Sequence, residues 1–587
     1  MHQTWNGRFF PRFNTGSRAR IPARRRWAFV LALSATLSAC TPSPDFDLIL
    51  RGGLLYDGLG GDPYVADVGV SADRIAEIGD LSGRSAAVEW DASGLAVGPG
   101  FINMLSWSTV SLLLDGRSQG ELRQGVTLQV MGEGTSMGPW NEAQIAEFGE
   151  RSGVEVDVDW TTLGEYLESL ERRGVATNVA SFVGATTVRI HELGYEDRPP
   201  AAEELERMQE LVRTAMGEGA MGVGTSLIYA PAFYASTEEL IALSAAAAET
   251  GGRYITHMRS EGGQLLEGVE EVLRIAREAG IGVEIYHLKA SGSENWPKME
   301  EVIRRIEAAR ASGIDITADM YTYTAGATGL NAVMPPWAQE GGHDAWMSNL
   351  RDPIIRARVE KEIAGKPVGW ENLLYDSGGA ENVLLVGFRN PDLRPLVGRT
   401  LAEVAADRGT SPEATAIDLV VEDDSRVDTV FFMMSEENVR RQIALPWVSF
   451  GSDAASMSAE GGFLESSTHP RAYGNFARLL GKYVRDEEVI SLQEAVRRLT
   501  SLPAENLSLR CRGRVTPGYF ADLVVFDPDT VQDHATFAEP HQYSTGVQEV
   551  WVNGGHVLSG GEPTGARTGR VVRGPGWTGW AGQEPTC

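Results

Sequence analysis

The chain has 587 residues, of which 42% are hydrophobic and 22% are charged, with 67 glycines. This composition is that of a globular protein and excludes extended disorder, collagen-like repeats and a membrane protein with many spans. The formal net charge of −28 argues against nucleic acid or an anionic lipid surface as a partner, and three cysteines are too few for a disulfide scaffold or a cysteine-rich metal cluster.

The first forty residues have the pattern of an export signal. They carry seven arginines and no acidic residue, followed by an apolar run at 27–40 that is too short for a membrane-spanning helix. Leu37-Ser-Ala-Cys40 resembles a bacterial lipobox, in which cleavage leaves a lipidated Cys40 at the N-terminus, and Thr41 after it favours the outer membrane. Plain secretion with an incidental cysteine is the alternative.

Two β-rich segments stand at the ends of the remaining chain. Residues 46–97 and 515–575 alternate apolar and polar positions in short runs, as antiparallel strands do, and we expect them to form one small β-sandwich domain together. The glycine-rich residues 564–587 are expected to form a tail that begins ordered and becomes loose. The sequence leaves open whether Cys511 and Cys587 pair.

Between these segments the pattern changes to strand, loop and helix. Eight apolar runs, most of them followed by a helical stretch, predict an α/β fold, a (β/α)₈ TIM barrel over residues 98–514. The interval 335–446, between strands seven and eight, is predicted to be an insertion near the active-site mouth. The eight runs lie at 95–105, 126–131, 176–183, 220–226, 254–257, 283–287, 314–320 and 447–450.

Polar residues follow several of these strands, at the end where barrel enzymes carry their chemistry. His257 and His287 lie at the ends of consecutive strands, Glu133 follows strand two and Asp453 follows strand eight. Imidazole and carboxylate ligands suit Zn²⁺ with one position left for water, and Asp453 is then placed to take a proton. The alternatives are hydrogen-bonded structural histidines, an exposed turn at Glu133 and a capping role for Asp453.

Short motifs spread over residues 46–575 resemble the amidohydrolase superfamily, in particular its D-aminoacylase (N-acyl-D-amino-acid deacylase) group. The resemblance implies a barrel with a small β-sandwich. It also implies that Lys289, Arg471 and one of Tyr321 and Tyr323 bind the substrate carboxylate. The motifs are Pro99-Gly-Phe-Ile-Asn103, Gln124-Gly-Val-Thr127, Thr256-His-Met-Arg-Ser-Glu-Gly262, His287-Leu-Lys289, Gly451-Ser-Asp453, His469-Pro-Arg471 and Pro517-Gly-Tyr-Phe-Ala-Asp-Leu-Val-Val-Phe526.

The chain departs from the family pattern at two places that matter for metal binding. Leu105 and Trp107 stand where family members usually carry His-x-His after strand one, and neither can bind a metal. Glu133 stands where D-aminoacylases carry a metal-bridging cysteine. The resemblance therefore implies one Zn²⁺ per chain, held by His257 and His287 with Glu133 as the third ligand.

We therefore expect a lipid-anchored, zinc-dependent hydrolase on the periplasmic side of the outer membrane that cleaves the amide bond of N-acyl-D-amino acids. A cyclic amide or a peptide is an alternative substrate, although the carboxylated lysine of hydantoinase-like relatives has no counterpart in 220–226. A degenerate, ligand-binding envelope lipoprotein is a second alternative, motivated by the missing histidine pair. Arg259 is interpreted as a structural ion-pair partner of Glu261.

Overall fold

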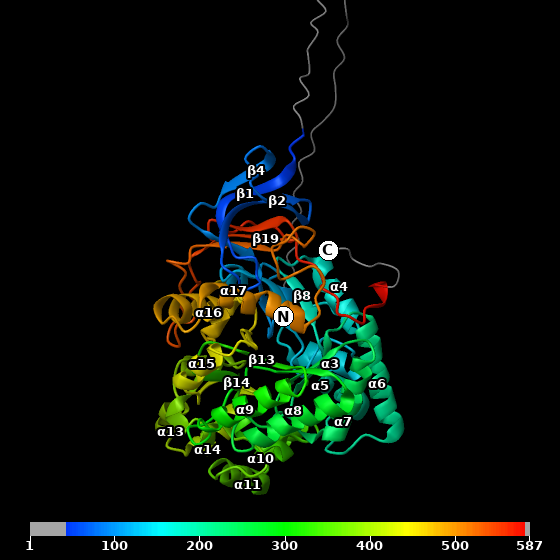
Figure 1. Ribbon diagram of the computed structural model, residues 1–587. Helices are drawn as coiled ribbons and strands as arrows, with labels where there is room; N and C mark the ends of the chain where they lie inside the picture. Colours follow the sequence, from blue (N-terminus) through cyan, green and yellow to red (C-terminus); the bar gives the residue numbers. More distant parts are fainter. Residues whose placement is uncertain (1–42, 581–586) are drawn as a thin grey trace, which may run out of the picture. The chain divides into compact units, whose positions relative to one another are not determined.

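The computed structural model describes residues 43–580 and Cys587. The expected export signal and its lipidation site Cys40 lie outside the described residues. Within 43–580, no helix combines the length and the apolar content that crossing a lipid bilayer requires. The predicted fold class, an α/β barrel with an additional antiparallel sheet domain, is confirmed (Figure 1).

Eight parallel strands form the barrel, and nearly all of their residues are buried. They are β6 (Phe101–Asn103), β7 (Val126–Met131), β8 (Asn178–Ser181) with its continuation β9 (Val183–Gly184), β10 (Gly222–Ser226), β11 (Arg253–His257), β12 (Gly282–Ile285), β13 (Ile316–Met320) and β17 (Val448–Phe450). Two hydrogen-bonded runs, β6-β7-β8 and β9-β10-β11-β12-β13-β17, make up the wall. The barrel closes beyond β6 and β17, where the Asp453 N–H donates to the Leu105 carbonyl oxygen at 2.9 Å.

The first barrel strand is shorter than the sequence predicts. The apolar run at 95–105 forms two strands, β5 (Ala96–Pro99) in the β-rich domain and β6 in the barrel. The Gly100 N–H donates to the Asp522 carbonyl oxygen, whereas the next N–H, that of Phe101, donates to Gly125, both at 2.9 Å. The chain changes partners between these two residues, and continuous hydrophobicity does not reveal such a change.

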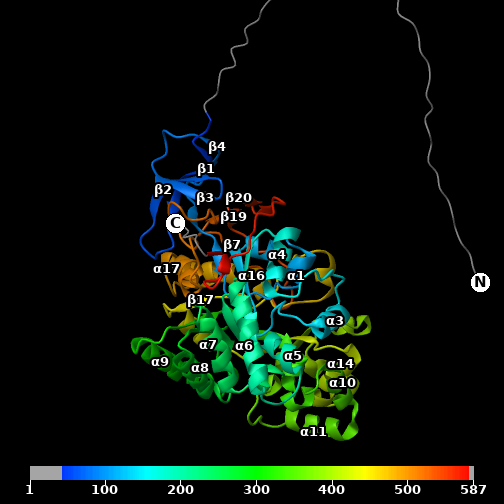
Figure 2. The same ribbon diagram turned by 90° about the vertical axis from the view of Figure 1, so that its right-hand side faces the viewer.

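Helices cover the outside of the barrel, and Figure 2 shows α6, α7 and α8 side by side. Side-chain caps fix several of their starts: the Ser236 hydroxyl, for example, accepts from the Glu239 N–H at the start of α7. The helices are α1 (Ser111–Leu114), α2 (Gln119–Leu122), α3 (Glu142–Arg151), α4 (Leu163–Arg173), α5 (Ala185–Leu193), α6 (Ala202–Gly217), α7 (Thr237–Ala248), α8 (Leu265–Ala279), α9 (Lys298–Ala311), α15 (Glu436–Ile443), α16 (Arg471–Arg478), α17 (Leu492–Leu499) and α18 (Ser501–Asn506).

The β-rich domain joins the two ends of the chain in one nine-stranded sheet, drawn in blue and red in Figure 1. Its order is β21-β20-β19-β18-β5-β1-β2-β3, and β4 pairs with β1. Alternating side chains such as Leu50, Val68, Leu523 and Trp551 form a core of their own. The strands are β1 (Phe46–Leu55), β2 (Tyr64–Ser71), β3 (Arg74–Gly79), β4 (Ala86–Asp91), β18 (Leu523–Phe526), β19 (Val547–Val552), β20 (Gly555–Ser559) and β21 (Glu562–Pro563).

The insertion between β13 and β17 carries its own small sheet and its own core. The sheet has the order β14-β16-β15 and begins at Ala325, before the sequence-based boundary at 335. Leu350, Val383, Leu419 and Phe431 pack in the separate core. The elements are β14 (Ala325–Gly329), α10 (His343–Arg351), α11 (Pro353–Ile363), α12 (Leu373–Asp376), β15 (Val383–Gly387), α13 (Leu401–Arg408), α14 (Pro412–Asp423) and β16 (Asp428–Phe432).

Residues 564–580, the first part of the segment expected to pass from ordered to loose, run along the amino ends of barrel strands. The Val572 N–H donates to Val179 at 2.8 Å, and the Gly574 N–H donates to Gly219 at 2.8 Å. Cys587 forms a disulfide with Cys511, with a Cα–Cα distance of 5.4 Å. The pairing that the sequence left open is therefore present in the structure.

Candidate metal centre and active-site cavity

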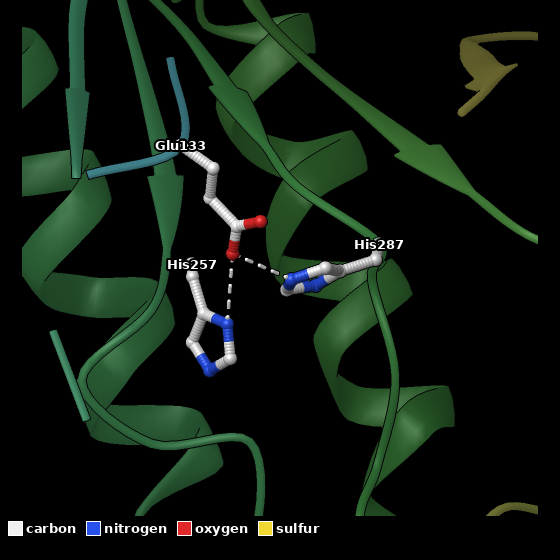
Figure 3. Close-up of side chains that lie close together, drawn as sticks. All are labelled: Glu133, His257 and His287. Carbon is white, nitrogen blue, oxygen red and sulfur yellow. Dashed lines mark hydrogen bonds and ion pairs between the residues drawn. The ribbon is translucent and has the colours of Figure 1, made fainter. Parts of the chain in front are cut away.

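Glu133 lies between His257 and His287 at the carboxyl ends of β7, β11 and β12 (Figure 3). Its Oε1 atom is 3.1 Å from Nδ1 of His257 and 3.1 Å from Nε2 of His287. All three side chains are buried. Among the described residues, no other group of three or more histidine, cysteine or acidic side chains brings its ligand atoms within 4.8 Å of one another.

The spacing of these three side chains fits a zinc ion. Zinc bonds to nitrogen and oxygen are about 2.0–2.2 Å long, so two ligand atoms of a tetrahedral ion lie about 3.3 Å apart. The two 3.1 Å separations are close to that value. Two imidazoles and a carboxylate are a donor set that zinc takes, and the fourth position is left for water.

The turn at Glu133 requires glycine on both sides. Gly132 has φ +107° and Gly134 has φ +70°, in the region that favours glycine. A Cβ atom on Gly132 would lie 2.3 Å from the Phe182 carbonyl oxygen, and one on Gly134 would lie 2.0 Å from Oγ of Ser226. From the sequence, a turn at Glu133 is the alternative to a metal-ligand role. Both apply, because this tight turn directs the Glu133 side chain into the barrel mouth.

His287 and Asp453 both have positive φ values, 34° and 49°. The His287 N–H donates to Oδ1 of Asp319 at 2.9 Å, and the Asp453 N–H donates to the Leu105 carbonyl oxygen at 2.9 Å. Non-glycine residues in this conformation are uncommon and concentrate at functional sites. These two hydrogen bonds hold the backbone in place at both positions.

Glu261 belongs to the site, contrary to the expected ion pair with Arg259. Arg259 instead reaches Glu271 on α8, with its Nε donating at 3.0 Å. Glu261 accepts from Nζ of Lys289 at 2.8 Å on each oxygen. Nδ1 of His287 lies 2.8 Å from that same Nζ and 3.1 Å from Oε1 of Glu261, so the Lys289–Glu261 pair orients the ring of His287. The only signal in the sequence is the place of Glu261 in the motif that contains His257.

The three carboxylates of the site differ in their electrostatics. Burial opposes the charged form of Glu133 and Glu261, but nearby cationic groups outweigh burial and lower the pKa of both carboxyls. For Glu133 these groups are the two histidines; for Glu261, Lys289 adds the largest favourable contribution. At Asp453 burial dominates over the attraction of Arg471 and raises the pKa of the carboxyl.

A cavity of about 440 Å³ opens at the metal-ligand triad. Asp453, Lys289, Tyr321 and Arg471 line it together with the three candidate ligands, so the structure brings these predicted residues to one place. Nη1 of Arg471 lies 2.8 Å from Oδ2 of Asp453, and its guanidinium stacks on the ring of Tyr321 at 4.5 Å. The insertion contributes further wall residues, among them Arg426 and Asp428.

Tyr323, the second tyrosine considered for the substrate carboxylate, does not line this cavity. Its hydroxyl lies 3.4 Å from Oδ2 of Asp533, and the guanidinium of Arg478 lies 4.7 Å from the centre of its ring. Its ring packs on His469 at 5.3 Å. Of the two tyrosines, Tyr321 is therefore the one that a bound substrate can reach.

Trp107 turns its indole toward the site. Its Nε1–H donates to Oε2 of Glu133 at 2.9 Å and to Oδ1 of Asp453 at 3.1 Å. Leu105 is fully buried in the barrel core with Met104 and Tyr286. Neither place of the usual histidine pair offers a metal ligand, and the hydrogen bonds of Trp107 could not be read from its residue type.

The barrel, the metal-ligand triad and the neighbouring acid define a hydrolase of the metal-dependent barrel class. Residues 400–558 match the model of the amidohydrolase family. The chain is 35% identical over 531 residues to the D-aminoacylase of Alcaligenes xylosoxydans xylosoxydans, which covers 90% of this chain and 98% of that protein. It is 32% identical over 532 residues to the N-acyl-D-glutamate deacylase of the same organism, covering 90% and 96%. The chain belongs to the amidohydrolase family, in its D-aminoacylase group.

Solved structures agree with this assignment. A D-aminoacylase studied for one-metal activation and second-metal attenuation of its binuclear centre has a TM-score of 0.74 at 35% identity, covering 90% of this chain and 100% of that one. The N-acyl-D-glutamate deacylase of Bordetella bronchiseptica, complexed with zinc and a phosphonate mimic of the tetrahedral intermediate, has a TM-score of 0.75 at 29% identity, covering 90% and 99%. A D-hydantoinase at 14% identity and a TM-score of 0.50 shares the fold alone.

Proposed function

We propose that this protein hydrolyses the amide bond of N-acyl-D-amino acids to a carboxylate and a free D-amino acid, with one zinc ion per chain. The observation that carries the proposal is the convergence of Glu133, His257 and His287 at 3.1 Å separations on the wall of a 440 Å³ cavity. The likeness to D-aminoacylase over nearly the whole of both chains supports the substrate class.

Asp453 is the proposed general base and acid. A bound zinc ion supplies Lewis-acid chemistry, polarising a carbonyl group and lowering the pKa of a water molecule toward neutrality. Asp453 takes the proton of the attacking water and delivers it to the nitrogen of the leaving amine. The raised pKa of this buried carboxyl suits both steps, because the acid form then persists closer to neutral pH.

Arg471, Lys289 and Tyr321 are proposed to bind the substrate carboxylate. They share the cavity with the triad, and a guanidinium offers paired donors to a carboxylate. The charged groups nearest the triad are the carboxylates of Glu133, Glu261 and Asp453 and the two cations of this set. Asp319 also contacts His287, but burial raises the pKa of its carboxyl well above the ordinary value and favours its neutral form. With one divalent ion and neutral histidines, a single positive charge remains, which one substrate carboxylate neutralises.

We propose that the protein is an exported bacterial lipoprotein, anchored through a lipid on Cys40 at the periplasmic side of the outer membrane. The basic and apolar character of residues 1–40 supports export. The disulfide between Cys511 and Cys587 supports an oxidising compartment, because such bonds persist there and are rare in the cytosol.

Replacement of Asp453 tests the catalytic proposal. We expect Asp453→Asn to lower kcat for an N-acyl-D-amino acid by about 10²–10⁴-fold, because the amide cannot accept the proton. Zinc content, measured by plasma mass spectrometry, should stay at about one ion per chain, whereas His257→Ala should lose it. Asp424→Asn is the matched control, since Asp424 also has a positive φ, 51°, but it pairs with His343 in the insertion and does not line the cavity. Retained turnover in Asp453→Asn would exclude Asp453 as the base.

A further inference from the structure

The indole N–H of Trp107 lies between the two carboxylates that face the open side of the metal site. The same nitrogen is 2.9 Å from Oε2 of Glu133 and 3.1 Å from Oδ1 of Asp453. The backbone fixes this position, because the Trp107 N–H donates to the Ala454 carbonyl oxygen at 3.0 Å and Ser106 bridges to Ala454. The contact therefore joins the ends of β6, β7 and β17.

Each oxygen of the two carboxylates has its own partner. Oε1 of Glu133 faces the two histidines, and Oε2 accepts from Trp107. Oδ1 of Asp453 accepts from Trp107, and Oδ2 pairs with Arg471 at 2.8 Å. Without a donor between them, two carboxylates this close would repel each other or would attract a cation. The indole N–H supplies that donor without adding charge.

The indole nitrogen cannot itself bind a metal, since it is a donor only. Leu105, at the other place of the usual histidine pair, is fully buried and apolar. The cleft between Glu133 and Asp453 therefore offers carboxylate oxygens that could bind a cation. The uncharged indole N–H of Trp107 already occupies this cleft.

We propose that Trp107 is a positioning residue that replaces a second cation. It holds Glu133 as a ligand that offers only one oxygen to the first ion, holds Asp453 in place as the base, and keeps a further ion out of the cleft between them. This inference rests on the proposed function, because it concerns the zinc site of that hydrolase. The alternative is that Trp107 acts only through its aromatic ring, as a partly exposed wall of the cavity. The experiment distinguishes this role from that of the N–H group.

Trp107→Phe tests the N–H separately, because phenylalanine keeps an aromatic ring and loses the donor. With untagged full-length protein, zinc affinity is measured by competition with a chromophoric chelator, and Co²⁺ is added as a spectroscopic substitute. We expect the variant to bind the first zinc about 10-fold more weakly, as loss of a partner that orients a ligand does, and to change the Co²⁺ absorption spectrum. The control is Trp160→Phe, since Trp160 is buried and its Nε1 has no hydrogen-bond partner.

Leu105→His with Trp107→His tests the exclusion of a second ion. The double variant should bind about one more zinc ion per chain than the wild type at equal excess zinc, because it introduces imidazoles at both places where family members usually carry His-x-His. If Trp107→Phe binds zinc and Co²⁺ as the wild type does, the inference is wrong while the proposed function stands. If the wild type takes up two ions in the site, the inference and the proposed count of one zinc ion are wrong, while the proposed hydrolysis stands. If the wild type binds no zinc at all, the inference and the proposed function fail together.

Discussion

At the scale of single residues, Glu121 on α2 is a buried carboxyl outside the active site. Its Oε2 lies 2.6 Å from the Ser456 hydroxyl, and its side chain meets no cation among the described residues. Burial raises the pKa of Glu121 to about 8, from an ordinary value of 4.5. The folded state therefore keeps this proton over a range in which the unfolded chain has lost it.

The raised pKa of Glu121 predicts a loss of stability as the pH rises from about 4.5 to about 8. In that window the folded chain binds more protons than the unfolded chain, so the free energy of unfolding falls with pH and levels off above it. Glu121→Gln mimics the protonated form, and we expect it to be more stable than the wild type at pH 9 by roughly 1–3 kcal/mol, but not at pH 4. Urea unfolding at both pH values measures this difference.

The exposed carboxylate Glu142 provides the control, since Glu142→Gln should leave the difference between the two pH values unchanged. If Glu121→Gln and the wild type have the same pH dependence of unfolding, then Glu121 is already ionised in the folded protein.

Site residues at the ends of barrel strands could be predicted from the sequence, whereas site residues whose position depends on a loop conformation could not. His257, His287 and Asp453 could be found because the carboxyl ends of parallel barrel strands meet at one face. Glu261 could not be separated from Arg259, because which of the two turns inward depends on the loop after β11. The contacts of Trp107 depend on three strand ends at once, and no local pattern encodes them.

At the scale of elements, the small sheet of the insertion brings Arg426 to the cavity wall. Its Nη2 donates to the Thr328 hydroxyl at 3.3 Å, and its guanidinium lies 5.8 Å from the ring of Tyr229. Tyr229 in turn packs edge-on against His257 at 5.6 Å. Its charge attracts the buried carboxyl of Asp428 on the same wall, but the hydrogen bond to Thr328 uses only one N–H group of the guanidinium, and the other N–H groups can meet an anionic group of the substrate.

Arg426 is therefore predicted to favour substrates with an acidic side chain. We expect Arg426→Ala to raise KM for N-acyl-D-glutamate by about 5- to 10-fold, as loss of a charged hydrogen bond does, with a smaller change for N-acyl-D-leucine. Steady-state kinetics on both substrates measures the ratio. Arg408→Ala is the control, because Arg408 pairs with Glu422 on the surface of the same insertion. Equal changes for both substrates would exclude this selectivity.

Helices and strands were easier to predict than the sheets to which the strands belong. A helical stretch was expected after most of the barrel strands, and α8 (Leu265–Ala279) follows β11 in this way. The run at 95–105 was equally apolar, yet it serves two sheets. A strand that is buried on both faces has the same apolar pattern in either sheet. The sequence pattern therefore could not show that the chain passes from one sheet to the other at Gly100. The extra sheet of the insertion was also missed, since β14 and β15 are short and contain glycines.

At the scale of the whole molecule, the disulfide encloses the chain from Cys511 to Cys587, a separation of 76 residues. This stretch contains β18 to β21 and the segment along the amino ends of the barrel strands. A cross-link of this span restricts the unfolded chain strongly. We expect it to contribute to the stability of the β-rich domain and of the barrel together.

Removal of this disulfide tests that contribution. Cys587→Ser should lower the free energy of unfolding by about 2–4 kcal/mol under oxidising conditions, measured by urea unfolding. The same comparison in dithiothreitol is the control, because the wild type should then behave like the variant. Equal stability of the two proteins without reductant would contradict the prediction.

The sheet that joins both chain ends also has a consequence for biosynthesis. β5 pairs with β18, and the two strands are separated by more than four hundred residues of chain. During translation β1 to β5 are made first, and the free edge of β5 has no partner until nearly the whole polypeptide exists. An unpaired edge of this kind is a template for aggregation. The nascent chain should therefore need a chaperone to cover its first strands until the last ones are synthesised.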